Sequence, residues 1–187
     1  VVYYVYAYAK LLENEEITEG EELNVTVPTG NFGNILAAYY AKQMGVPIGK
    51  LICASNENKV LFDFFQTGVY DRNREFILTS SPSMDILISS NLERLIYTIA
   101  GQDAEKDAQL MAQLKDRGVY EITPEMREKL ADFAGGYATE EECRDAIRTT
   151  YEKTGYVMDT HTAVAAAVCK KYRSDSGDAR KCLVAST

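Results

Sequence analysis

The sequence predicts an α/β protein built on a mostly parallel sheet. Short runs rich in β-branched residues alternate with longer stretches of helical periodicity, and this alternation is typical of α/β folds. Residues 23–54 hold a strand, a turn, a helix and a second strand in succession. That succession has the length of a parallel crossover, in which a helix joins two parallel strands. The 187 residues contain no repeat of fixed period and no low-complexity linker, so we expect a single α/β domain over 1–187.

The first expected helix covers residues 1–12 and is apolar, with four tyrosines among its first eight residues. This composition predicts a buried helix. The acidic stretch that follows, over 13–22, is typical of a solvated connector.

The central unit begins with a strand over 23–27, whose β-branched residues favour extended structure and whose ladder ends at Pro28. A helix over 35–44 contains good helix formers and stops at Gly45. The second strand of the unit is expected over 50–54.

The pattern repeats more loosely through the middle of the chain. We expect a helix over 58–66, a strand over 74–78 and a helix over 86–100, which follows a serine-rich loop. Residues 103–115 and 124–134 have the spacing of amphipathic helices.

Two helices with clear start signals follow. Thr139 is placed to cap a helix that reaches about Lys153 and has acidic residues in its first turn. Asp159 or Thr160 is placed to cap another helix, which runs to Lys171.

The last expected element is a buried strand over 182–186, after a polar turn. The chain starts without a methionine, inside a helix-like pattern, and stops directly after this apolar run. These features predict a fragment of a longer protein.

Composition argues against two classes of partner. The net charge is −8, the pI is near 4.8, and lysine and arginine form no cluster, so the chain lacks the basic surface that binds nucleic acid. No apolar run approaches the ~18 residues of a membrane span. Residues 1–9 are too short for one and lack the basic start of a signal peptide.

The four cysteines stand at positions 53, 143, 169 and 182 and form no CxxC pair. Their spacing predicts neither a zinc site nor a disulfide framework. We therefore expect reduced thiols, a cytoplasmic location and no metal site.

Residues 29–34 (TGNFGN) lie between the first strand of the central unit and the start of its helix. The two glycines allow a sharp turn and a close approach to a ligand, and the first N–H groups of a helix have no partner within it. With the helix dipole, these groups can hold a phosphate without lysine or arginine. Asn31 and Asn34 can cap the helix or donate to the ligand. The segment predicts an anion-binding loop.

Other interpretations of this loop remain. The segment has only GxxG, short of the GxGxxG of dinucleotide-binding folds, and the Walker pattern GxxxxGK[ST] is absent. A tight turn with two packing glycines, without any ligand, explains the same residues.

A longer co-linear resemblance to one protein family makes the interpretation of this loop more specific. Residues 25–70 (VTVPTGNFGNILAAYYAKQMGVPIGKLICASNENKVLFDFFQTGVY) resemble the threonine synthases, which are pyridoxal-phosphate enzymes of the tryptophan-synthase-β fold type. Segments 80–97 (SSPSMDILISSNLERLIY), 155–168 (GYVMDTHTAVAAAV) and 182–187 (CLVAST) resemble later parts of the same family. Residues 101–153 fit the family only in pattern.

The resemblance implies a three-layer α/β/α sandwich that forms part of the large domain of a fold-type-II pyridoxal-phosphate enzyme. In that family the loop that matches 28–35 holds the phosphate of pyridoxal 5'-phosphate, mostly through backbone N–H groups. A threonine near the end of the last strand, 182–187 here, meets the pyridine nitrogen, and Thr187 matches it. The phosphate-loop residues that match are Gly30, Asn31, Phe32, Gly33 and Asn34.

The reaction that the resemblance implies is the conversion of O-phosphohomoserine and water to L-threonine and phosphate, the last step of threonine biosynthesis. The Schiff-base lysine of the family lies upstream of the region that corresponds to Val1. We therefore assign no catalytic residue in this chain and expect it to be inactive alone. The expected partners are the missing N-terminal part of the same enzyme and a second copy in a homodimer.

Two alternative functions remain. One is another fold-type-II lyase, such as a serine or threonine dehydratase, and the other is a non-catalytic anion-binding module.

Some further residues are candidates for the site. His161 starts a helix and suits either a general base or a capping and packing residue. Ser81, Ser83 and Asp85 could line a pocket for the substrate phosphate. Asn56 and Asn58 follow the second strand, where they could contact a ligand or form a turn. Ser89, Ser90 and Asn91 could likewise line the pocket, and Ser90 or Asn91 could instead cap the following helix.

Overall fold

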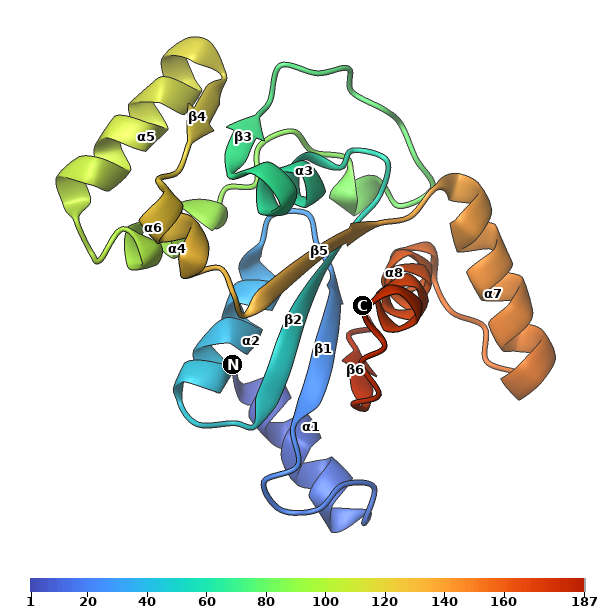
Figure 1. Cartoon of the computed structure of the whole chain (residues 1–187). Helices are drawn as coiled ribbons and strands as arrows, with labels where there is room; N and C mark the ends of the chain where they lie inside the picture. The colour runs from blue at the N-terminus through green and yellow to red at the C-terminus, as the bar shows by residue number, and fades with distance from the viewer. Residues whose placement is uncertain (187) are drawn as a thin grey trace.

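The computed structural model describes residues 1–186, and Figure 1 shows the order of its elements. The first half contains α1 (Val2–Glu13), β1 (Leu23–Pro28), α2 (Gly33–Gln43), β2 (Ile48–Ser55), α3 (Val60–Thr67), β3 (Val69–Asp71), the 3₁₀ turn η1 (Pro82–Met84) and α4 (Leu92–Ile99). The second half contains α5 (Ala104–Arg117), β4 (Val119–Glu121), α6 (Pro124–Glu128), β5 (Phe133–Tyr137), α7 (Glu140–Thr154), α8 (Thr160–Ser176) and β6 (Cys182–Val184).

Four strands form a parallel sheet in the order β5-β2-β1-β6. The register pairs Thr26 of β1 with Ile52 of β2 on one side and with Val184 of β6 on the other. β1, α2 and β2 form the parallel crossover that the sequence of residues 23–54 predicts. The α/β class and the mostly parallel sheet are therefore confirmed.

Helices cover both faces of the sheet, and Figure 1 shows α2 and α8 on opposite sides of it. Successive residues of β2 point to opposite faces. Leu51 and Cys53 belong to the larger hydrophobic core with residues of α2 and α3, whereas Ile52 and Ala54 belong to a second core with residues of α7 and α8. Every residue of β1 is buried, because this strand is covered by helices on both faces of the sheet.

Both predicted N-caps in the last third of the chain are confirmed. Thr139 forms a capping box with Glu142, in which Thr139 N donates to Glu142 Oε2 at 2.8 Å and Glu142 N donates to Thr139 Oγ1 at 3.3 Å. Asp159 Oδ1 accepts from His161 N at 2.8 Å and from Thr162 N at 3.0 Å. Asp159, rather than Thr160, is therefore the cap of α8.

The prediction of a strand over 74–78 is wrong, because these residues form a loop. Their backbone bonds to a side chain instead of a strand: Asn58 Nδ2 donates to Ile77 O at 2.7 Å, and Ile77 N donates to Asn58 Oδ1 at 2.9 Å. The extended residues of this region lie earlier, in β3, which pairs with β4 in antiparallel orientation. Each of these two strands has only three residues, too few to show a period in the sequence.

Two helices expected in the middle of the chain are shorter than predicted. The helix expected over 86–100 starts at Leu92, since the residues before it bond to the loop after β1. The helix expected over 124–134 ends at Glu128, and β5 follows it. β5 contains Gly135 and Gly136, which are poor strand formers but allow close packing: a Cβ on Gly136 would lie 2.5 Å from Val168 Cγ1 of α8.

Burial differs from expectation at the two ends of the chain. In α1, expected to be a buried helix, Tyr4 is buried but Tyr3 is 85% exposed, because only one side of the helix packs against α2. β6, expected to be buried, is half-buried because it lies at the edge of the four-stranded sheet.

Candidate functional site

The predicted anion-binding loop connects β1 to α2 at the carboxyl ends of the central strands. This edge is where open parallel sheets bind ligands. Thr29 fixes the start of the loop, because its N–H donates to Ala54 O of β2 at 2.8 Å and its hydroxyl donates to Val27 O at 2.7 Å. The chain then turns at Phe32, which has a φ of 64°, and enters α2 at Gly33.

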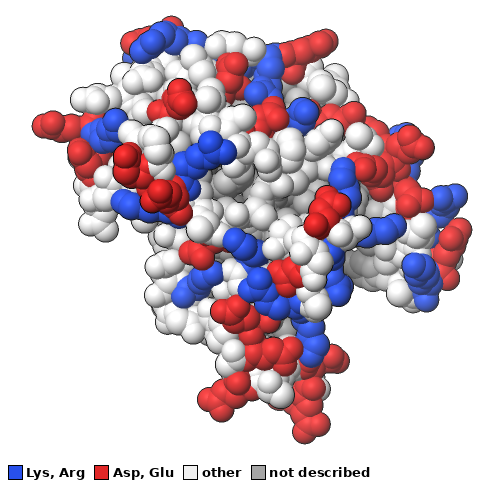
Figure 2. Space-filling view, viewed as in Figure 1, with Lys and Arg blue, Asp and Glu red and all other residues white. Residues whose placement is uncertain are grey.

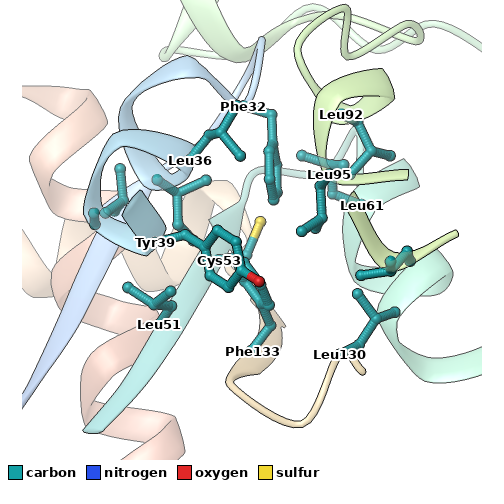
Figure 3. Packing of buried hydrophobic residues seen from close by; sticks show 14 of the residues in the cluster. Phe32, Leu36, Tyr39, Leu51, Cys53, Leu61, Leu92, Leu95, Leu130 and Phe133 are labelled. Atoms are coloured by element: carbon teal, nitrogen blue, oxygen red, sulfur yellow. The ribbon is translucent and has the colours of Figure 1, made fainter. Parts of the chain in front are cut away.

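Phe32 anchors the loop in the hydrophobic core. Its ring is buried and packs against Phe65 and Phe133, with centroid distances of 6.2 and 5.9 Å. Figure 3 shows the Phe32 ring pointing into this core between Leu36 and Leu95. The left-handed backbone costs roughly 1–2 kcal/mol, and burial of a phenylalanine contributes roughly 1.5–3 kcal/mol. Phe32 can therefore hold the turn, but it offers only its backbone to a ligand.

The backbone N–H groups of residues 30–35 form no hydrogen bond with any residue from 1 to 186. They lie at the start of α2, where the helix dipole also favours negative charge. Asn31 and Asn34 do not cap the helix, contrary to one of the roles expected for them. Asn34 Oδ1 instead accepts a hydrogen bond from Tyr4 Oη at 2.7 Å. The N–H groups are therefore free to bind an anion.

A cavity of about 330 Å³ opens in front of these groups and is lined by residues 27–35 together with Ser83, Met84, Asn91 and His161. Its lining includes no aspartate, glutamate, lysine or arginine. A phosphate there would meet backbone N–H donors and no repelling carboxylate. This donor set fits the phosphate of pyridoxal phosphate without depending on the overall charge of −8.

The segment before α4 holds the loop from the outside. Ser89 Oγ donates to Gly30 O at 2.7 Å, and Asn91 Nδ2 donates to Asn31 O at 2.8 Å. Both carbonyl groups are thereby fixed, so the N–H groups of the loop keep their direction. Neither role was predicted, since the partners are some sixty positions apart in the sequence.

A buried polar network places η1 against the loop. Asp85 Oδ1 accepts hydrogen bonds from Asn56 Nδ2 at 2.8 Å, Asn58 Nδ2 at 2.9 Å and Thr79 Oγ1 at 2.7 Å. Ser81, fully buried, receives a bond from Asn56 at 3.1 Å. These candidate ligand residues are therefore structural, and they tie the 79–85 loop to the end of β2.

Ser83 and His161 form a second contact above the loop. Ser83 N donates to His161 Nε2 at 3.3 Å, and His161 Nδ1 lies 3.5 Å from Asp159 Oδ1. Both residues line the cavity, in agreement with their prediction as candidate site residues. The described contacts of His161 are those of a residue that holds η1 at the start of α8.

The cysteines do not belong to this site. All four are free, and burial raises the pKa of Cys53 to about 12 and that of Cys143 to about 11. No metal-binding cluster of histidine, cysteine, aspartate or glutamate occurs within residues 1–186. Thr187, expected to face the pyridine nitrogen, lies outside the described residues.

The charged side chains of the surface bear on partners of other kinds. Figure 2 shows acidic and basic side chains interspersed on the face viewed in Figure 1, with no continuous basic surface there. No described helix combines the length and the apolar composition needed to cross a membrane.

Comparison with known proteins relates the chain to a family. No family model matches it. Threonine synthase-like 1 of Macaca fascicularis is 49% identical over 173 residues, which are 91% of this chain and 23% of that protein. Threonine synthase of Saccharomyces cerevisiae is 34% identical over 192 residues, covering 95% of this chain and 37% of that protein. The chain thus spans about a quarter to somewhat more than a third of the curated relatives it matches.

Comparison with solved structures gives the same relationship. The threonine synthase of Brucella melitensis with pyridoxal phosphate bound has a TM-score of 0.89 and 36% identity, over 100% of this chain and 38% of that one. An L-serine ammonia-lyase of Rhizomucor miehei matches at a TM-score of 0.54 and 12% identity, over 97% of this chain and 49% of that one, which shows the fold alone. The four-stranded parallel sheet therefore matches part of the fold-type-II pyridoxal-phosphate enzymes. Within that class, the chain is homologous to the threonine synthases over part of their length.

Proposed function

We propose that the protein containing this chain is a threonine synthase, a pyridoxal-phosphate lyase that converts O-phosphohomoserine and water to L-threonine and phosphate. The observation that carries the proposal is the set of N–H groups at residues 30–35 that have no partner among residues 1–186 and face a cavity without acidic side chains. Homology to threonine synthases over most of the chain supports the choice of reaction.

In this proposal the phosphate of pyridoxal 5'-phosphate binds the backbone N–H groups of the loop, and the bound cofactor supplies the electron sink that the reaction needs. Ser89 and Asn91 fix the loop carbonyls, so the donors need little rearrangement when the anion binds. We further propose that Thr187 offers a neutral hydroxyl to the pyridine nitrogen. The residues assigned to the phosphate are Gly30, Asn31, Phe32, Gly33 and Asn34.

The proposal divides the work between this chain and the rest of the enzyme. The chain supplies a single α/β domain with the phosphate loop at 28–35 and the terminal segment at 182–187. Within that segment the strand β6 covers only Cys182–Val184, so it is shorter than the strand predicted from the sequence. The lysine that carries the cofactor is supplied from outside residues 1–187, so the isolated chain is expected to be inactive. The enzyme is expected in the cytoplasm and could act as a homodimer.

The direct test measures products formed from O-phosphohomoserine by the full-length protein, with and without added pyridoxal phosphate. Threonine and phosphate released in equal amounts, only when the cofactor is present, are the expected result. Inorganic phosphate alone, without threonine, would contradict the proposal.

A second candidate is a related pyridoxal-phosphate lyase of the dehydratase kind. Keto-acid formation from serine or threonine, without turnover of O-phosphohomoserine, would support this candidate. Absence of any cofactor binding would leave a non-catalytic anion-binding module.

A further inference from the structure

Tyr4 makes a contact that its helix does not explain. Among the residues of α1, Tyr4 is 6% exposed, whereas the adjacent Tyr3 is 85% exposed. The Tyr4 hydroxyl donates a hydrogen bond to Asn34 Oδ1, with an oxygen–oxygen distance of 2.7 Å. Asn34 belongs to the first turn of α2 and lines the anion cavity. A residue of an exposed helix thereby reaches the candidate site.

The hydroxyl at position 4 has a role beyond packing. A phenylalanine would bury the same ring without placing a polar group away from water, and a buried hydroxyl is costly unless it has a partner. Burial raises the pKa of Tyr4 well above its usual value, so the hydroxyl stays protonated at neutral pH. It can donate as well as accept, but if Nδ2 of Asn34 donated to it, its own proton would have no acceptor among the described residues.

The carboxamide of Asn34 has an acceptor end and a donor end. Tyr4 occupies the acceptor end, while Nδ2 forms no hydrogen bond with any described residue. In the opposite orientation, Oδ1 would become the free end and would repel an anion. The contact with Tyr4 therefore selects the orientation of Asn34 that can donate to a phosphate.

We propose that Tyr4 is a positioning residue of the anion site, whose hydroxyl holds the Asn34 carboxamide with Nδ2 available to the bound phosphate group. The inference rests on the proposed function in that the phosphate belongs to pyridoxal 5'-phosphate. Tyr4 itself touches no ligand in this arrangement and acts through Asn34.

The test compares Tyr4→Phe with Tyr3→Phe in the full-length protein. Tyr4→Phe removes only the hydroxyl that Asn34 accepts, and Tyr3→Phe removes an exposed hydroxyl from the same helix. We expect Tyr4→Phe to weaken pyridoxal phosphate binding about 5- to 50-fold, which corresponds to one charge-assisted hydrogen bond. Tyr3→Phe should leave the affinity unchanged. Pyridoxal without its phosphate should bind both variants as it binds the wild type.

A double variant separates positioning from a general structural effect. In an Asn34→Ala background, adding Tyr4→Phe should change the affinity less than about twofold, because the group that Tyr4 orients is gone. Equal losses in both backgrounds, an equal loss for pyridoxal, or an unchanged Tyr4→Phe affinity would each overturn the inference.

Failure of the proposed function gives a different result. A wild-type protein that binds no pyridoxal phosphate would contradict the proposed function, and the same variants would then be titrated with inorganic phosphate, followed by ³¹P NMR. Phosphate binding that Tyr4→Phe weakens and Tyr3→Phe does not would support the positioning role at a plain anion site. If the wild type also fails to bind inorganic phosphate, both the proposed function and the positioning role of Tyr4 are overturned.

Discussion

Gly30 and Gly33 lie three positions apart in the phosphate loop, yet the surrounding structure restricts them differently. A Cβ on Gly30 would lie 2.7 Å from Ser83 O, a backbone atom in η1. A Cβ on Gly33 would lie 3.3 Å from Asn91 Nδ2, the end of a side chain that can move. The fold itself therefore forbids a side chain at Gly30, before any ligand is considered.

This difference predicts separate outcomes for two alanine variants. Gly30→Ala should displace η1, lower the free energy of unfolding by about 1–3 kcal/mol and weaken cofactor binding. Gly33→Ala should weaken cofactor binding with little change in unfolding. Urea denaturation and cofactor titration of the full-length variants measure both effects. A larger loss of stability in Gly33→Ala than in Gly30→Ala would contradict this account of the loop.

At the scale of elements, α8 depends on its cap. Burial raises the pKa of Asp159, but hydrogen bonds from the Thr162 hydroxyl and from the N–H groups of Thr162 and His161 lower it more, so the pKa lies below its ordinary value. A carboxyl with a lowered folded-state pKa stabilises the fold fully above its unfolded value, about 3.9, and this contribution is lost as the pH falls through the folded value.

Asp159→Ala should therefore lower the free energy of unfolding by about 0.5–2 kcal/mol at pH 7. Asp159→Asn keeps an oxygen acceptor and should lose less. The difference between wild type and Asp159→Asn should shrink when unfolding is measured at about pH 3. A difference that grows on acidification would show that the carboxylate does not act as this cap.

β5 depends on the small volume of its glycines. A Cβ on Gly136 would lie 2.5 Å from Val168 Cγ1, so Gly136→Ala should push α8 away from the sheet and lower the free energy of unfolding by about 1–3 kcal/mol. Combining it with Val168→Ala should recover part of the lost free energy of unfolding, because alanine at position 168 leaves room for the added Cβ. Chemical denaturation of the single and double variants measures this coupling, and strictly additive losses would contradict it.

The sequence predicted those elements whose signals are local. The loop at 29–34 and the caps Thr139 and Asp159 depend on residues within about one turn of each other, and each strand and helix of the crossover around the loop has its own local pattern. β5 was missed because its two glycines favour close packing, and that advantage exists only once α3 and α8 are in place.

In the candidate site, too, the sequence predicts only the features that depend on neighbouring residues. The N–H groups of the loop follow from the strand–turn–helix pattern, whereas the residues that hold them come from distant segments. Asn91 reaches Asn31, His161 reaches Ser83, and Tyr4 reaches Asn34. A polar residue far along the chain carries no sign of which carbonyl or amide it will meet, so these contacts require the folded structure.

For the whole molecule, the exposed side of α1 is an apolar surface that no other part of the described chain covers. Val2, Tyr3 and Tyr6 are 76%, 85% and 61% exposed. A contiguous apolar surface of this kind favours association. We expect the isolated chain of residues 1–187 to self-associate as its concentration rises.

Light scattering after size-exclusion chromatography measures this tendency. Tyr3→Lys together with Tyr6→Lys should shift the isolated chain towards the monomer, while Tyr151→Lys, at an exposed tyrosine of α7, should not. A wild-type chain that stays monomeric at high concentration would contradict the expectation.

The order of the sheet also bears on how the molecule reaches its native state. β1 pairs on one side with β2, which follows it after a single helix, and on the other with β6, at the far end of the chain. Closing the longer connection costs more chain entropy, so the β1–α2–β2 unit should assemble early and β6 should dock late. The phosphate cradle would then exist on a half-built sheet, while the strand that leads to Thr187 arrives last. Under the proposed function, cofactor binding would begin at the phosphate end and be completed only after β6 has docked.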